Sequence, residues 1–195
     1  MRLLRDGDID DYLAIEFDSF FDKLGPVYGN QRRAAYRIIK KELQDNLDLG
    51  RYLNAVYGDR IVGIIELITR ENSRGYRKQF SNYSRNLGIL GALRAYFFTF
   101  LDMPAIDSST IYINNVAVSR EFRRKGVASA MLSYAEYIAR SRGKDRLKLW
   151  VANDNKAAFK FYRKMGFYQL MFRSSRLAQR YMGYREWVFM CKDVF

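Results

Sequence analysis

Two segments of different hydrophobic pattern are joined by a basic turn with one glycine, Arg123-Arg124-Lys125-Gly126-Val127-Ala128. Residues 111–118 before the turn are rich in Ile and Val and predict a strand, and residues 127–142 after it carry apolar side chains at helical spacing. The first backbone N–H groups of a helix have no internal acceptor and lie at the positive end of its dipole. Because a glycine there lets an anion approach the backbone, the turn predicts a phosphate-binding site.

A second strand and helix follow about twenty residues later. Residues 147–152 predict the strand, and the helical segment after it begins near Asn155, carries Tyr162 and ends at Gly166-Phe167. Taken alone, each feature has a plainer interpretation. The basic turn could be a solvated helix start, Asn155 an ordinary helix cap, and Tyr162 part of an apolar helix stripe. The order and spacing of the two units favour the functional interpretation.

Together the two units, which cover residues 111–167, resemble the two signature motifs of the GNAT superfamily of N-acetyltransferases. The turn is similar to the family's loop for the pyrophosphate of acetyl-CoA, in which Arg-x-x-Gly-x-Ala follows a strand. The resemblance implies an α/β (α+β) fold, with a central mixed, mostly antiparallel sheet of about seven strands flanked by helices. It also implies one acetyltransferase domain over residues 1–195, with acetyl-CoA (CoA) as co-substrate and no metal.

The resemblance assigns much of the cofactor site to the backbone. It implies that a short run of the preceding strand lies beside the pantetheine like an extra strand, and that run is Val116, Ala117 and Val118. It implies that the N–H of Val116 stabilises the oxyanion of the reaction. Residues 123–128 would hold the pyrophosphate, and Asn155 would contact the cofactor at the start of the second helix.

Tyr162 matches the family tyrosine that donates a hydrogen bond to the sulfur of CoA. A phenol with a pKa of about 10 can donate to a thiol with a pKa of about 8.5 as charge develops on the sulfur. The single cysteine, Cys191, lies outside both motifs, so no cysteine in the motif region can carry an acyl group. We therefore expect direct attack by an amine in a ternary complex.

The general base is not evident from the motifs. Many relatives carry Glu or Asp in the strand just before the Val-Ala-Val run, whereas this chain has Asn114 and Asn115 there. Glu66 interrupts an otherwise apolar predicted strand, where a carboxylate is costly unless it is paired, solvated or functional. Glu66 is therefore the candidate base. The alternatives are a salt bridge between Glu66 and a nearby Arg, and proton transfer through water held by Asn114.

Composition limits the remaining possibilities. A chain of 195 residues usually forms one domain, and 49% apolar residues suffice for a packed core. One Cys and no His exclude a disulfide framework within the chain, a multi-cysteine zinc site, and Ser-His-Asp or Cys-His catalysis. The N-terminus has no apolar signal region, because it is interrupted by four acidic residues, Asp6, Asp8, Asp10 and Asp11. A cytoplasmic protein is therefore expected.

The chain is strongly basic, with a net charge of +13, which indicates an anionic partner or ligand. Nucleic acid is the usual partner of such a basic chain, but the basic residues are spread throughout and no nucleic-acid-binding motif accompanies them. We therefore expect no nucleic acid, and a basic binding module is the third hypothesis for function. A polyanionic cofactor accounts for part of the charge.

The rest of the chain predicts alternating strands and helices. Hydrophobic periodicity places a strand at 2–5, helices at about 8–24 and 30–46, a hairpin at 51–57 and 61–68, and closing strands at 168–172 and 186–192.

An insertion at about 71–107 follows the third of these strands, and its apolar centre at 87–101 is too short to span a bilayer. It predicts a helix packed on the core or on a second copy in a homodimer. A wall over the acceptor pocket and shallow membrane contact are the alternatives.

These observations predict an N-acetyltransferase that moves the acetyl group of acetyl-CoA to a primary amine. The alternative is a non-catalytic acyl-CoA-binding or regulatory domain of the same fold, which the absence of a carboxylate at Asn114 and Asn115 would support. The acceptor stays open among a small amine, an aminoglycoside-like sugar, a free amino acid and a protein N-terminus.

Overall fold

The strands form one seven-stranded sheet in the order β1-β2-β3-β4-β5-β7-β6. The computed structural model describes residues 1–73, 80–102, 106–175, 179 and 186–194. The strands are β1 (Arg2–Leu3), β2 (Tyr52–Tyr57), β3 (Arg60–Ile68), β4 (Thr110–Val118), β5 (Arg146–Ala152), β6 (Tyr168–Ser174) and β7 (Glu186–Asp193). The main helices are α1 (Ile9–Leu24), α2 (Arg32–Asp45), α3 (Phe80–Asp102), α4 (Val127–Ser141) and α5 (Lys156–Lys164).

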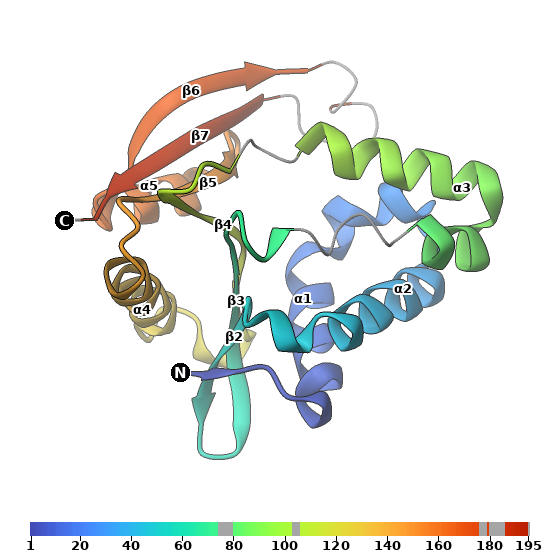
Figure 1. Cartoon of the computed structure of the whole chain (residues 1–195), viewed down its shortest axis with the longest axis horizontal. Helices are drawn as coiled ribbons and strands as arrows, with labels where there is room; N and C mark the ends of the chain where they lie inside the picture. Colours follow the sequence, from blue (N-terminus) through green and yellow to red (C-terminus); the bar gives the residue numbers. More distant parts are fainter. Residues whose placement is uncertain (74–79, 103–105, 176–178, 180–185, 195) are drawn as a thin grey trace.

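Helices cover both faces of the sheet. Figure 1 shows α1 and α2 on one side of β3 and β4 and α4 on the other. Successive side chains of β3 point to opposite faces of the sheet, so the core has two parts. Ile64 belongs to the cluster under α1 and α2, and Ile65 belongs to the cluster under α4. Gly63 lets α4 approach closely, because a Cβ there would lie 3.1 Å from both Met131 and Val127.

The pairing of β4 with β5 is the only parallel one in this sheet and it is short. It joins Thr110 to Arg146 and ends with Tyr112 opposite Lys148, although β4 continues to Val118. Neighbouring strands elsewhere in the sheet run antiparallel. The second half of β4 therefore has no strand partner on its β5 side within the described chain.

A β-bulge in β4 lies beside that unpaired edge. Ile65 pairs with Val116 and Leu67 with Ile113, so Asn114 and Asn115 together face the single residue Glu66. A bulge of this kind bends the strand and redirects its side chains. Both asparagine side chains consequently reach carboxylates on the α1 side of the sheet, at Glu66 and Glu16.

The predicted mixed sheet and the helix between β3 and β4 are confirmed. The first predicted helix, at about 8–24, begins one residue later, at Ile9. Asp8 stands at the N-terminal cap position of α1 without a capping hydrogen bond, because its carboxylate instead binds Arg2 and the backbone N–H of Arg5.

The insertion contains the helix α3, which is broken at Gly88 by a left-handed φ of 70°. Ala92 and Ala95 are buried, whereas Ile89, Leu90 and Leu93 are exposed, so one face packs on the core and another does not. Residues 74–79 and 103–105 and the side chains of 96–102 lie outside the described residues, and a second copy or a pocket wall stays a prediction. Within the described chain, no helix is both long and apolar enough to cross a membrane.

Candidate active site

The basic turn forms the start of α4 as predicted. Gly126 is the residue before the helix and has a φ of 82°, and Arg124 also has a positive φ, of 61°. No side chain caps this helix end, so its first N–H groups are left for another acceptor. A Cβ on Gly126 would meet nothing within 4 Å, so the glycine is favoured by its left-handed backbone rather than by a close protein neighbour.

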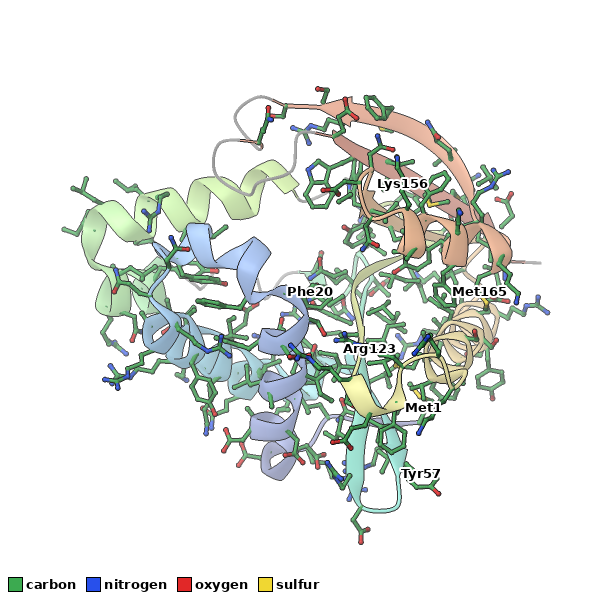
Figure 2. The ribbon with its side chains drawn as sticks, turned by 180° about the vertical axis from the view of Figure 1, so that it is seen from behind. Met1, Phe20, Tyr57, Arg123, Lys156 and Met165 are labelled. Carbon is green, nitrogen blue, oxygen red and sulfur yellow. The ribbon has the colours of Figure 1, made fainter. Side chains whose placement is uncertain are left out.

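Arg123 ties the turn to β4 and α1. Its Nε donates to the backbone oxygen of Val118 at 3.0 Å, and its guanidinium pairs with Asp18 of α1 at 3.1 Å. Figure 2 shows Arg123 between the ribbon of α1 and the start of α4. Arg124 and Lys125 are exposed, so they are the cations of the turn that a phosphate could meet first.

The backbone of β4 has a defined direction at its unpaired edge. The N–H of Ser119 donates to the oxygen of Val62 in β3, and antiparallel strands alternate in this respect. The backbone N–H and C=O groups of Ala117 therefore point toward β3. Those of Val116 and Val118 point the other way, toward the edge of β4 that is not paired with β5. This agrees with the oxygen of Val118 being free to accept from Arg123. The N–H of Val116 thus faces the open edge, where the predicted oxyanion donor must be.

Tyr162 lies on α5 and packs on the same core cluster as Val116, Val127 and Ala128. Its ring contacts those of Phe161 and Phe167, with centroids 5.4 and 5.7 Å apart. Burial raises the pKa of Tyr162 to about 12, so its phenol keeps its proton at neutral pH. Tyr162 therefore belongs to the helix stripe and still retains a proton to donate.

Asn155 caps α5. Its Oδ1 accepts from the N–H of Ala158 at 3.1 Å, which confirms the plainer interpretation of this residue. Only its Nδ2 group is then left to contact a cofactor, and that contact stays a prediction.

Glu66 is buried and paired, as its alternative interpretation proposed. Its Oε1 lies 3.3 Å from Nε of the fully buried Arg51, and its Oε2 accepts from Asn114 at 2.6 Å. Arg51 also lies 3.5 Å from Glu42 of α2 and donates to the hydroxyl of Tyr52 at 2.6 Å. The predicted salt bridge of Glu66 to an Arg is thus present, and its role as the base stays a prediction.

The sequence interpretation missed Glu16, a second carboxylate beside the bulge. Glu16 is on α1 with only 6% of its surface exposed, and its Oε1 accepts from Asn115 at 3.2 Å. Burial, with repulsion from Glu66 and Glu42, raises its pKa to about 8. The signal was present, because Glu16 interrupts the apolar stripe of α1 that contains Tyr12, Leu13 and Phe20.

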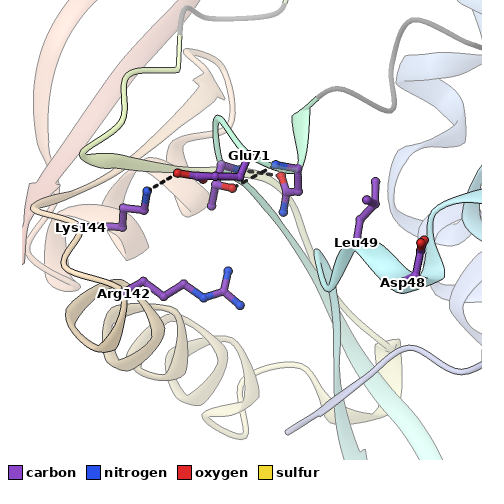
Figure 3. A pocket seen from close by; sticks show the side chains of 7 residues that line it. Asp48, Leu49, Glu71, Arg142 and Lys144 are labelled. Atoms are coloured by element: carbon purple, nitrogen blue, oxygen red, sulfur yellow. Dashed lines mark hydrogen bonds and ion pairs between the residues drawn. The ribbon is translucent and has the colours of Figure 1, made fainter.

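A polar cavity of about 580 Å³ lies beyond the other end of α4. Figure 3 shows Glu71, Arg142 and Lys144 around it, with Lys144 bonded to Glu71 at 2.9 Å. Hydrogen bonds from Thr69 and Lys144 lower the pKa of Glu71 to about 2. The cavity contains none of the predicted site residues. In the part of the chain that the structure describes, no cluster of three or more His, Cys, Asp or Glu could hold a metal ion.

Comparison with known proteins gives a family match over most of the chain. The acetyltransferase (GNAT) family model matches residues 12–167. An uncharacterized N-acetyltransferase of Methanocaldococcus jannaschii is 36% identical over 55 residues, which is 28% of this chain and 24% of that protein. The chain thus matches about a quarter of the length of this curated relative.

Solved structures extend the likeness in fold. Ard1 from Thermoplasma volcanium has a TM-score of 0.62 at 17% identity, over 100% of this chain and 96% of its own. PaiA N-acetyltransferase from Thermoplasma acidophilum, solved with coenzyme A, has a TM-score of 0.61 at 17% identity, over 98% and 96%. A GNAT family acetyltransferase from Elizabethkingia anophelis with acetyl-CoA bound has a TM-score of 0.53 at 17% identity, over 79% and 82%. At this level of identity the likeness concerns the fold alone.

Proposed function

This chain belongs to the acetyltransferase (GNAT) family, and we propose that it is an acetyl-CoA-dependent N-acetyltransferase that acts on a primary amine by direct attack in a ternary complex. One observation carries the proposal. The unpaired edge of β4 leads through Arg123 into an uncapped helix start with a left-handed glycine. The solved relatives with coenzyme A and acetyl-CoA bound support the same ligand.

Acetyl-CoA would bind along this edge. The outward-pointing backbone groups of Val116 and Val118 can pair with its pantetheine amides as a further strand would. The N–H groups at the start of α4, with Arg124 and Lys125, suit its pyrophosphate. The co-substrate supplies an acetyl thioester, which the N–H of Val116 can polarise by donating to the carbonyl oxygen.

Removal of the amine proton needs a group beside this edge. Glu66 stays a proposal for this role, directly or through water on Asn114, and the bond between their side chains supports it. The alternative of a non-catalytic domain rested on the asparagines at 114 and 115. Two buried carboxylates, Glu16 and Glu66, bind those asparagines, so a proton acceptor at this position is available after all.

We expect acetyl-CoA to stabilise the folded protein. When an amine is added, the acetyl group should be transferred to it and CoA should be released with a free thiol. At about 100 times its dissociation constant the ligand should add about 2.7 kcal/mol, or roughly 5–10 °C in melting temperature for a chain of this size. Thermal unfolding and thiol release test this, with n-butylamine, an amino sugar, a free amino acid and a short peptide as acceptors. A melting temperature that moves with an oligonucleotide but not with acetyl-CoA would favour the third hypothesis instead.

Tyr162→Phe should lower kcat by about 10- to 100-fold with little change in acetyl-CoA affinity. With a pKa of about 12, full proton transfer from Tyr162 to a thiolate of pKa about 8.5 is uphill, so Tyr162 acts by donating a hydrogen bond as the C–S bond breaks. Steady-state kinetics measure the effect. Tyr137→Phe, at an exposed position of α4, is the matched control. Equal turnover in the two variants would leave Tyr162 as a packing residue only.

A further inference from the structure

The carboxylate of Glu16 is buried with one oxygen unsatisfied. Its Oε1 accepts from Asn115, whereas no hydrogen-bond donor for its Oε2 is found among the described residues. Leaving a buried polar atom without a partner is costly, and a catalytic role is one of the recognised reasons for which native proteins retain such atoms. The observation therefore points to a donor that arrives from outside the chain.

Asn115 links Glu16 to the proposed reaction centre. Asn115, which binds Glu16, directly precedes Val116, whose N–H faces the open edge of β4. Asn114 is exposed and Asn115 is half-buried, so the bulge that leads to Glu16 is accessible to an amine. An ammonium group has three N–H donors and a positive charge, which suits an unsatisfied carboxylate oxygen.

The surroundings of Glu16 come from four further segments and are mostly acidic or phenolic. The titratable groups that act on Glu16, or on which Glu16 acts, are Tyr12 on its own helix, Tyr28 in η2 (Gly25–Tyr28), Glu42 on α2 and Glu66 on β3. Arg51 and Tyr52, at the start of β2, form a further layer, since both act on Tyr12 and Arg51 lies 3.3 Å from Glu66. Burial of the carboxylate and the negative charges of Glu66 and Glu42 keep its pKa near 8, between those of an ordinary carboxylate and of an alkylammonium. A base is most effective when its pKa lies near the working pH.

We propose that Glu16 is the catalytic residue that receives the acceptor's ammonium group and takes its proton, so that the acceptor is a cationic primary amine entering from the α1 side of the β4 bulge. The proposal rests on the proposed function. One proton passes from the ammonium nitrogen to Oε2 of Glu16, and the freed lone pair forms the C–N bond to the acetyl carbon. The C–S bond breaks with its electron pair going to sulfur, and that thiolate takes up the second nitrogen proton as the amide forms, so that the products are the amide, CoA with a free thiol and protonated Glu16. Glu16 here takes the role of base proposed above for Glu66, and Glu66 instead holds Asn114 and raises the pKa of Glu16.

The test compares kcat/KM for thiol release with n-butylamine between about pH 6 and pH 10, where kcat/KM reports ionisations of the free enzyme. Wild-type protein should show a rise with an apparent pKa near 8. Glu16→Gln should lose this rise of kcat/KM with pH, which is the limb of the profile that Glu16 controls. Its kcat/KM should be about 100-fold below that of wild type near neutral pH, and the difference should shrink at higher pH as free amine becomes abundant. Glu66→Gln should keep the limb but move it to lower pH, because one of the charges that raise the pKa of Glu16 is gone. Asp10→Asn, an exposed carboxylate change on the same helix, should behave as wild type.

A second measurement does not depend on activity. A carboxyl whose pKa rises from 4.5 to about 8 on folding binds its proton more tightly in the folded state, so it lowers stability progressively as the pH rises through that interval. Glu16→Gln removes this loss. The variant should therefore melt increasingly later than wild type as the pH rises from 4.5 to about 8, with a constant difference above that.

Two kinetic results would overturn the inference. One is a Glu16→Gln profile that parallels wild type at every pH, and the other is a limb lost in Glu66→Gln but kept in Glu16→Gln, which would make Glu66 the base. A melting difference that does not change with pH would also contradict it. Failure of the proposed function looks different, because the wild-type protein itself would then release no thiol with any amine.

Discussion

Gly126→Glu is expected to abolish acetyl-CoA binding while the chain remains folded. The substitution puts a carboxylate at the helix start where the pyrophosphate should lie, and it replaces an attraction for two negative charges with a repulsion. It also forces an ordinary residue into a φ of 82°, which costs about 1–2 kcal/mol. A Cβ has open space at this position, so the fold should tolerate the change. Calorimetry with acetyl-CoA on the purified variant measures the loss.

Gly143→Glu provides a closely matched control. Gly143 follows the other end of α4, has a φ of 60°, and also has no neighbour within 4 Å of an added Cβ. The two variants therefore share the same chemical change and the same backbone strain, and they differ only in which helix end receives the charge. We expect Gly143→Glu to bind acetyl-CoA as wild type does. Equal binding by both variants would refute the phosphate site at Gly126.

Much of the backbone geometry proposed to bind the cofactor could be predicted from the sequence because it depends on local structure. A strand, a glycine turn and a helix within residues 111–142 fix where the N–H groups of the helix start will be. The same holds for the helix that carries Tyr162. A left-handed φ at Gly126 and a helix cap at Asn155 are likewise local properties of their segments.

The acceptor side could not be predicted in this way, because it depends on the register of distant strands. The β2–β3 hairpin is shifted by a bulge between Ala55 and Val56, and this shift helps set which residue lies beside Glu66 at the far end of the pair. The bulge at Asn114 and Asn115 is set by the pairing of β3 with β4. Nothing in the local sequence places Glu16, 99 residues from Asn115, against that bulge. The position of Glu16 in an apolar helix stripe indicates that this residue is unusual, but it does not predict that Asn115 is its partner.

Arg51 connects these elements, and its replacement should have the largest effect on stability. The side chain is fully buried, lies 3.3 Å from Glu66 and 3.5 Å from Glu42, and has its guanidinium 4.9 Å from the centre of the Tyr52 ring. Arg51→Leu would leave two carboxylates without this guanidinium in a buried setting. Removing one partner of a buried ion pair typically costs about 3–5 kcal/mol.

For a chain of this length, that cost corresponds to a fall of roughly 6–20 °C in melting temperature. Arg51→Lys, which keeps the charge but loses the planar fork, should fall between wild type and Arg51→Leu. Arg146→Leu is the control for a surface pair, since Arg146 lies 3.7 Å from Asp193 with both side chains at least a third exposed, and should cost less than about 1 kcal/mol. If Arg51→Leu melts no earlier than Arg146→Leu at neutral pH, then Arg51 does not hold the carboxylates of Glu42 and Glu66 in place.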